Sequence, residues 1–223
     1  MKEDGMKKNG IKKVWLMFVS AITLLMITTT PGSAAENFSE GKQYQKLDRP
    51  AAAEQQVIEF FSFYCPHCYQ FDKIYGVSQA VEKILPPGVK MTRYHVQFLG
   101  LFGKELTQAW AVATVLGIED KISPLIFEAV QKTETIKSPD DIRNIFIKTG
   151  VSGTEYDAAL NSFVVKSLVS QQVKTAENFK LRGVPAMFVN GNYMIINEGM
   201  ETELMDDYAK RYADVVSFLI NKK

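Results

Sequence analysis

Two cysteines separated by two residues, in Cys65-Pro66-His67-Cys68, constrain this chain more than any other feature. The 223 residues contain no third cysteine, so neither thiol has another pairing partner within the chain. A disulfide that closes so short a loop constrains little chain entropy and stabilises a fold poorly. The pair lies between the apolar run 57–63 and a stretch with helical spacing. A C-x-x-C in that setting is typical of a redox-active site.

The position of the motif predicts different roles for its two thiols. Cys65 directly precedes the predicted helix, and Pro66 occupies the first turn, where its missing N–H costs nothing. Free N–H groups and the helix dipole at this end stabilise a thiolate, and a protonated His67 would add to that effect. We expect Cys65 to be the exposed nucleophile and Cys68, one turn into the helix, to be the shielded resolving thiol. Each pKa unit of Cys65 below ambient pH stabilises the reduced form by ~1.4 kcal/mol, so the disulfide should be an oxidant.

The first 35 residues have the pattern of a secretory signal peptide. Four lysines between positions 7 and 13 precede the apolar stretch 14–27, and Ser33-Ala34-Ala35 offers small residues for cleavage. The alternative is a membrane anchor, but the apolar stretch is short beside the roughly 20 residues that a span needs. We therefore predict cleavage, export and no stable membrane insertion. Translation can begin at Met1 or Met6.

The charge balance of the mature chain excludes some partners. Residues 1–35 hold five of the 26 basic and two of the 25 acidic side chains, so residues 36–223 carry a net charge of −2. This near-neutral balance has no electrostatic footprint for nucleic acid or for an anionic membrane. The remaining length suits one domain, or one domain with an insertion.

The elements predicted around the motif form a β-α-β unit. A strand over 56–63, rich in β-branched and aromatic residues, is expected to be central and buried. A helix over 66–85 and a strand over 89–98 follow it, which predicts a parallel pair with a right-handed crossover. A short strand over 43–47 precedes the unit.

Helical patterns then dominate until the strands return near the C-terminus. Five helices are predicted, over 105–116, 124–130, 139–147, 154–162 and 164–181. Asn190-Gly191 between apolar runs predicts a hairpin, and a closing helix is expected over 203–220. This order predicts an α/β protein with a thioredoxin-like fold over 36–99 and 176–223, and an all-helical insertion over 100–175.

Pro185 is the second element of the predicted site. It lies at the start of a predicted strand, and a proline cannot simply continue a central ladder. In thioredoxin-like folds a cis proline faces the C-x-x-C, and the backbone before it pairs with the bound peptide. This resemblance predicts a cis Val184–Pro185 bond and assigns Val184 and Pro185 to substrate binding.

Segments across the mature chain closely resemble the DsbA family, namely 61–71, 104–112, 162–168 and 182–191. The resemblance implies a monomeric thiol:disulfide interchange protein of the Gram-negative periplasm, without a cofactor. It would donate its Cys65–Cys68 disulfide to reduced, unfolded exported proteins through a mixed disulfide at Cys65. It also implies reoxidation by a DsbB-like, quinone-linked membrane protein.

The same family carries buried charges near the resolving cysteine, and Glu59 matches one of them. Asp72 and Arg93 stand where related sequences often have Glu and Lys, so the resemblance assigns redox tuning to Glu59, Asp72 and Arg93. The apolar loop 98–102 is shorter than usual. Its Leu99, Leu101 and Phe102 are candidates for an exposed rim that contacts unfolded substrates.

Other uses of the motif fit the sequence less well. Zinc needs two further ligands, and the chain has only His67 and His95 to offer, so no metal is predicted. Haem attachment needs histidine where Tyr69 stands. His95 is expected to be an ordinary, partly buried residue of its strand. An isomerase or a reductase, and a non-catalytic chaperone on the same fold, remain the alternative functions.

Overall fold

The computed structural model describes residues 38–200 and 205–222. The predicted signal peptide, residues 1–35, lies outside the described residues. No helix within the described ranges combines the length and the hydropathy that crossing a bilayer requires.

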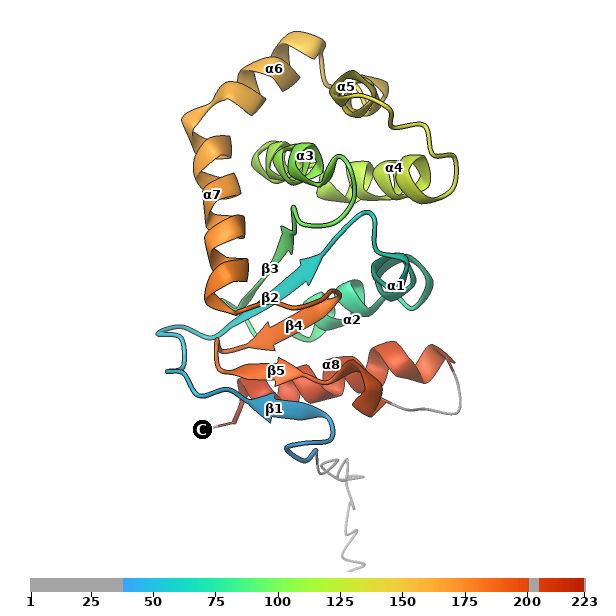
Figure 1. The fold of residues 1–223 in the computed structure, drawn as a ribbon. Helices are drawn as coiled ribbons and strands as arrows, with labels where there is room; N and C mark the ends of the chain where they lie inside the picture. Colours follow the sequence, from blue (N-terminus) through green and yellow to red (C-terminus); the bar gives the residue numbers. More distant parts are fainter. Residues whose placement is uncertain (1–37, 201–204, 223) are drawn as a thin grey trace, which may run out of the picture. The chain divides into compact units, whose positions relative to one another are not determined.

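The described part of the chain forms a five-stranded sheet in the order β1-β5-β4-β2-β3 (Figure 1). Only β2 and β3 run parallel, and the β1–β5, β5–β4 and β4–β2 pairs are antiparallel. The parallel pair and the antiparallel hairpin were both predicted and are confirmed. The strands are β1 Tyr44–Lys46, β2 Gln56–Phe61, β3 Lys90–His95, β4 Ala186–Val189 and β5 Tyr193–Ile195.

Strand β2 is central because side chains on both of its faces are apolar. Val57 packs into a core shared with α2 (Val77–Ile84) and α8 (Met205–Ile220). Ile58 and Phe60 point to the other face, where α7 (Phe163–Asn178) covers them. This two-sided burial is why the strand lacks simple polar alternation. The site at its C-terminal end therefore rests on a rigid element.

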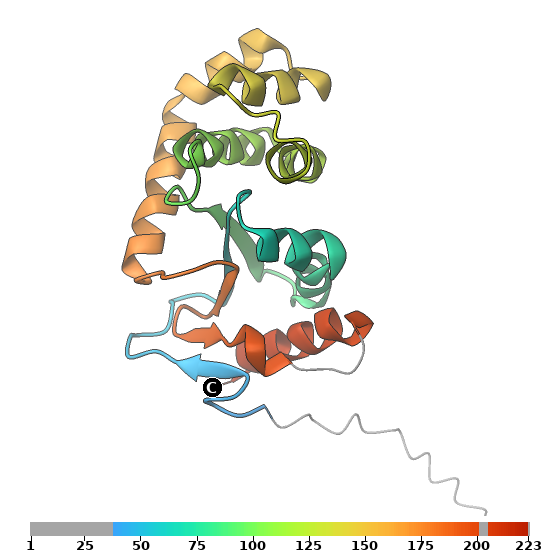
Figure 2. The same ribbon diagram turned by 45° about the vertical axis from the view of Figure 1, so that its right-hand side comes forward.

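The remaining helices of the insertion cluster together, beyond the ends of β2 and β3, and α7 runs from them back along the sheet (Figure 2). They are α3 Gly103–Leu116, α4 Glu119–Gln131, α5 Pro139–Lys148 and α6 Gly153–Asn161. Two aromatic residues link this cluster to the sheet. The Phe61 ring lies 4.9 Å from that of Trp110, and the Phe63 ring lies 4.8 Å from that of Phe127.

The prediction of one continuous helix over 66–85 is wrong. The stretch consists of α1 (Pro66–Tyr69), a π-helical segment η1 (Gln70–Ile74) and α2. Gly76 has a φ of +66°, a left-handed conformation that suits glycine and that separates η1 from α2. Single π-turns inside helices occur often at functional sites.

Several predicted boundaries also move. Strands β2 and β3 end two and three residues earlier than predicted, at Phe61 and His95, where the chain turns into the site and into the apolar loop. Helix α4 begins at Glu119, five residues earlier than predicted, and contains Pro124. A proline there costs one backbone hydrogen bond, which the burial of Ile122, Ile126 and Phe127 outweighs.

Candidate active site

Cys65 caps the helix that carries the second cysteine. Its backbone is extended, with φ −89° and ψ 114°, and its sulfur accepts a hydrogen bond from the Cys68 N–H at 3.3 Å. Both cysteines carry free thiols in this structure. Cys68 is 1% exposed, and Cys65 is 8% exposed. The expectation of an exposed Cys65 is therefore wrong, because the Val184 segment lies against its sulfur.

The environment of Cys65 favours the thiolate. It lowers the Cys65 pKa from 9.0 to about 6. The largest cause is the hydrogen bond from the Cys68 thiol, which burial opposes, and the backbone N–H groups of Cys68 and His67 add to it. The charge of His67 makes the smallest of these contributions. His67 therefore acts more through its backbone than through its imidazole.

Cys68 has the opposite character. Burial raises the pKa of its thiol far above the usual range, and the neighbouring Cys65 raises it further. The two thiols therefore share one proton at neutral pH, held on Cys68 and donated toward the Cys65 sulfur. Only Cys65 is a ready nucleophile, because the thiolate is the reactive form.

The Val184–Pro185 segment faces Cys65. The Val184–Pro185 bond is cis, which confirms that prediction. The Cys65 sulfur lies 3.2 Å from the Val184 carbonyl, to which its protonated form donates. A groove of about 450 Å³ continues from this contact. Apolar and aromatic side chains line much of it, among them Phe71, Tyr75 and Tyr208.

The three predicted tuning residues meet in one buried cluster. Glu59 and Arg93 are directly paired across the parallel strands β2 and β3. Arg93 Nε lies 2.9 Å from Glu59 Oε2, and its Nη2 lies 3.2 Å from Asp72 Oδ2. Ser78 also donates to Glu59, and Lys73 lies 3.2 Å from Asp72. The structure thus brings together residues that are far apart in the sequence.

The pKa values of the two acids in this cluster are shifted in opposite directions. Burial raises the pKa of Glu59, although Arg93 opposes the shift. Burial also acts to raise the pKa of Asp72, but Arg93 and Lys73 together outweigh it and hold that pKa below its usual value. The charge of Glu59 in turn adds to the raised pKa of Cys68. Glu59 is thus the member of the cluster whose charge acts on Cys68.

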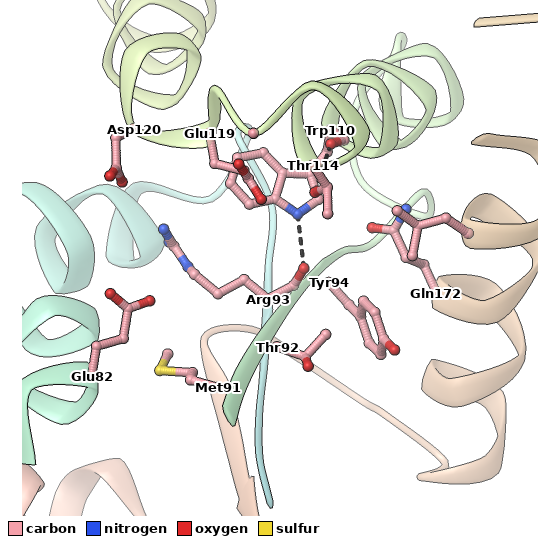
Figure 3. A pocket seen from close by; sticks show the side chains of 12 residues that line it. Glu82, Met91, Thr92, Arg93, Tyr94, Trp110, Thr114, Glu119, Asp120 and Gln172 are labelled. Carbon is pink, nitrogen blue, oxygen red and sulfur yellow. Dashed lines mark hydrogen bonds between the residues drawn. The ribbon is translucent and has the colours of Figure 1, made fainter. Parts of the chain in front are cut away.

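Arg93 also borders a cavity of about 340 Å³ on the side of the helical insertion (Figure 3). Glu82 and Asp120 lie around the end of its side chain in this view, and the Trp110 indole N–H donates to the Arg93 carbonyl at 2.8 Å. The Arg93 guanidinium lies 4.8 Å from the centre of the Phe61 ring. Strand β3 is thereby fixed to α3.

The chain is similar to known proteins over nearly its whole length. The sequence profile of the DSBA-like thioredoxin domain matches residues 56–213. The thiol:disulfide interchange protein DsbA of Yersinia pestis is 62% identical over 213 residues, which cover 96% of this chain and 100% of that protein. The chain belongs to the DsbA family. It is accordingly a thiol:disulfide oxidoreductase with the thioredoxin-like fold that the sequence predicts.

Solved structures of DsbA proteins agree with this assignment. Proteus mirabilis DsbA matches with a TM-score of 0.80 at 54% identity, over 83% of this chain and 98% of that chain. A variant of Proteus mirabilis DsbA in which serine replaces a cysteine was solved with the non-covalently bound peptide PWATCDS. It matches with the same TM-score and identity, over 83% of this chain and 100% of that chain.

Two residues that sequence reasoning missed hold the active-site turn of this DsbA-family chain. Gln131, at the end of α4, donates from Nε2 to the carbonyls of Phe63 and Cys65 at 2.7 and 3.0 Å. His95 accepts from the Phe63 N–H at 3.1 Å through Nε2. Peptide groups before and after Cys65 are thus bound by side chains of the helical insertion and of β3.

His95 is fully buried rather than partly buried as expected. Burial lowers its pKa to about 3, so the ring is neutral. Because Nε2 accepts, Nδ1 carries the proton and donates to Thr107 Oγ1 at 2.8 Å; Thr107 in turn donates to the Gly103 carbonyl. No sequence signal indicates this role of His95, because its place beside Phe61 depends on the register of β2 and β3 in the folded sheet. Gln131 had no signal, because α4 approaches the turn only in the folded chain.

The predicted apolar rim is present in part. Leu101 is 84% exposed and Phe98 is 53% exposed, whereas Leu99 and Phe102 pack against the helical core. The loop also contacts the residue before the nucleophile, since the Phe102 N–H donates to the Tyr64 hydroxyl at 3.3 Å. Of the three predicted rim residues Leu101 alone is strongly exposed, and the neighbouring Phe98, which was not among them, is exposed as well.

Proposed function

We propose that the Cys65–Cys68 disulfide oxidises reduced exported proteins in the periplasm. A substrate thiolate attacks the Cys65 sulfur, the Cys65–Cys68 bond breaks, and Cys68 leaves and takes up a proton. A second substrate thiolate then attacks the substrate sulfur of the mixed disulfide and releases the Cys65 thiolate. Two electrons pass from the substrate dithiol to the enzyme disulfide.

The observation that carries this direction is the stabilised Cys65 thiolate. A pKa of about 6 stabilises the reduced enzyme at neutral pH by roughly one pKa unit, ~1.4 kcal/mol or ~30 mV. Cys65 is also the better leaving group for the second step, because a thiol of low pKa departs faster. Pro66 contributes by starting the helix without an unsatisfied N–H.

Substrate binding is assigned to Val184 and Pro185. Their support is the 3.2 Å contact between Val184 O and the Cys65 sulfur, and the groove that adjoins it. The cysteine-containing peptide bound by the Proteus mirabilis relative supports a peptide ligand at this chain's site as well. Glu59, Asp72 and Arg93 are assigned to redox tuning: the charge of Glu59 acts on Cys68, and Arg93 pairs with both acids.

Around this reaction we place an exported monomer and a membrane partner. Residues 1–35 direct export, and a DsbB-like, quinone-linked membrane protein reoxidises the dithiol. Residues 36–99 and 176–223 form the redox domain, and 100–175 form the helical insertion. Gln131 gives the insertion a role, because it donates to two carbonyls of the active-site turn.

Capture in the periplasm tests the proposal. A Cys68→Ala chain, expressed with its leader in a Gram-negative host, should accumulate mixed disulfides at Cys65, because the Cys65 thiolate attacks disulfides of exported proteins and releases one of their thiolates, while no resolving thiol then frees Cys65. The adducts should be exported cysteine-containing proteins, identified by mass spectrometry after reduction. A Cys65→Ala/Cys68→Ala chain is the matched control. Failure to form adducts, or adducts with non-exported proteins alone, would contradict the proposal.

A further inference from the structure

The Asn197 side chain connects the Val184–Pro185 segment to the last helix. Asn197 begins the short 3-10 helix η2 (Asn197–Met200) after β5. Its Nδ2 donates to the Pro185 carbonyl at 2.9 Å, and its Oδ1 accepts from the Tyr212 hydroxyl at 3.1 Å. A carbonyl can only accept, so the amide has one orientation that satisfies both contacts.

The Pro185 carbonyl needs this partner because it lies outside the sheet ladder. Strand β4 begins at Ala186, and the first residue paired with β2 is also Ala186. Side chains contact the segment before it at two points: the Cys65 sulfur lies 3.2 Å from Val184 O, and Asn197 donates to Pro185 O. The first contact changes whenever Cys65 reacts, and the second does not.

Asn197 is itself held by a rigid support. Tyr212 is fully buried, and its ring meets the Phe71 ring edge-on at 5.0 Å. Phe71 belongs to η1, which continues the helix of Cys68. The Tyr208 hydroxyl adds a 3.5 Å contact to the Asn197 carbonyl. A continuous series of contacts thus runs from the cysteine helix through Phe71, Tyr212 and Asn197 to Pro185.

We propose that Asn197 is a positioning residue for peptide substrates. It fixes the distance between Cys65 and the Val184–Pro185 edge. At this distance a peptide backbone pairs with the edge while the sulfur of the peptide's cysteine reaches Cys65. The inference rests on the proposed assignment of Val184 and Pro185 to substrate binding. A small dithiol needs no backbone pairing, so Asn197 should matter for peptides and not for small thiols.

Peptide binding in a Cys65→Ser background tests the inference directly. With a cysteine-containing heptapeptide as the probe, Asn197→Ala should raise the dissociation constant about five- to tenfold, as expected for one lost hydrogen bond in an ordered segment. Asn197→Asp should weaken binding by at least as much, because it keeps the acceptor for Tyr212 and removes the donor to Pro185. Asn221→Ala is the matched control, since its Nδ2 donates to the Ser217 carbonyl on α8.

A second measurement separates positioning from general damage. In the chain that retains both cysteines, Asn197→Ala should leave the Cys65 pKa and the rate of dithiothreitol oxidation within about twofold of the unsubstituted chain. Unchanged peptide affinity in both Asn197 variants would overturn the inference alone, as would equal losses with peptide and dithiothreitol. Absence of peptide binding by the Cys65→Ser chain itself would instead contradict the substrate role of Val184 and Pro185, and the inference with it.

Discussion

The Cys65→Ala variant is expected to lose dithiol oxidation by at least about a thousandfold, because no Cys65–Cys68 disulfide can form for a substrate thiolate to attack. Cys68 remains in this variant but should not replace Cys65. Its thiol is 1% exposed, and burial, the largest cause of its raised pKa, persists without Cys65. The thiol form is a poor nucleophile, so the remaining cysteine should be nearly inert at neutral pH.

Alkylation of the two single-cysteine chains measures this difference. Cys65 in Cys68→Ala should react with iodoacetamide at least about a hundredfold faster than Cys68 in Cys65→Ala, because both its thiolate fraction and its access are greater. Thermal unfolding of both variants controls for loss of structure. Comparable alkylation rates would contradict the assignment of nucleophile and resolving thiol.

Replacing Arg93 with methionine should lower the free energy of unfolding by about 3–5 kcal/mol at neutral pH, because it leaves Glu59 and Asp72 buried without their shared cation. Glu59 has a raised pKa in the folded chain, so its contribution to stability is complete below 4.5 and is lost as the pH rises. Asp72 has a lowered pKa, so its contribution is present above 3.8 and is lost as the pH falls.

Removal of Arg93 should raise the pKa of both carboxyls, those of Glu59 and Asp72. Each loses a charge that lowers its pKa. The deficit in unfolding free energy relative to the unsubstituted chain should therefore shrink as the pH falls from about 7 to about 5. Urea unfolding at the two pH values measures it. Arg143→Met is the matched control, because Arg143 pairs with Asp157 at 2.8 Å on the surface, where ion pairs contribute little. A deficit no larger than that of Arg143→Met, or one that does not depend on pH, would contradict this role of the cluster.

The sequence predicts those parts of the site that depend on local order. The apolar run before Cys65, Pro66 at the helix start and the late Pro185 lie in the arrangement they imply. The family resemblance adds Glu59, Asp72 and Arg93, and the fold brings them together because β2 and β3 are adjacent and parallel. Periodicity also predicts the helices of the insertion, although α3 buries the five consecutive residues 109–113 rather than a single face.

Contacts made only in the folded chain could not be predicted in this way. Gln131 and Asn197 are polar residues of unremarkable segments, and each acquires its partner by the packing of a distant element. The burial of Cys65 has the same origin, because Val184 is remote in sequence. The break at Gly76 depends on a left-handed backbone that helical spacing does not reveal.

Titration of the reduced protein by thiolate absorbance tests the central claim most directly. One transition is expected below neutral pH, with a pKa of about 6, assigned to Cys65 by its absence in Cys65→Ala and its persistence in Cys68→Ala. The pKa in Cys68→Ala should be higher than in the unsubstituted chain, because the Cys68 thiol is the largest cause of the shift. A Cys65 pKa above neutral pH would contradict the account of this disulfide as an oxidant.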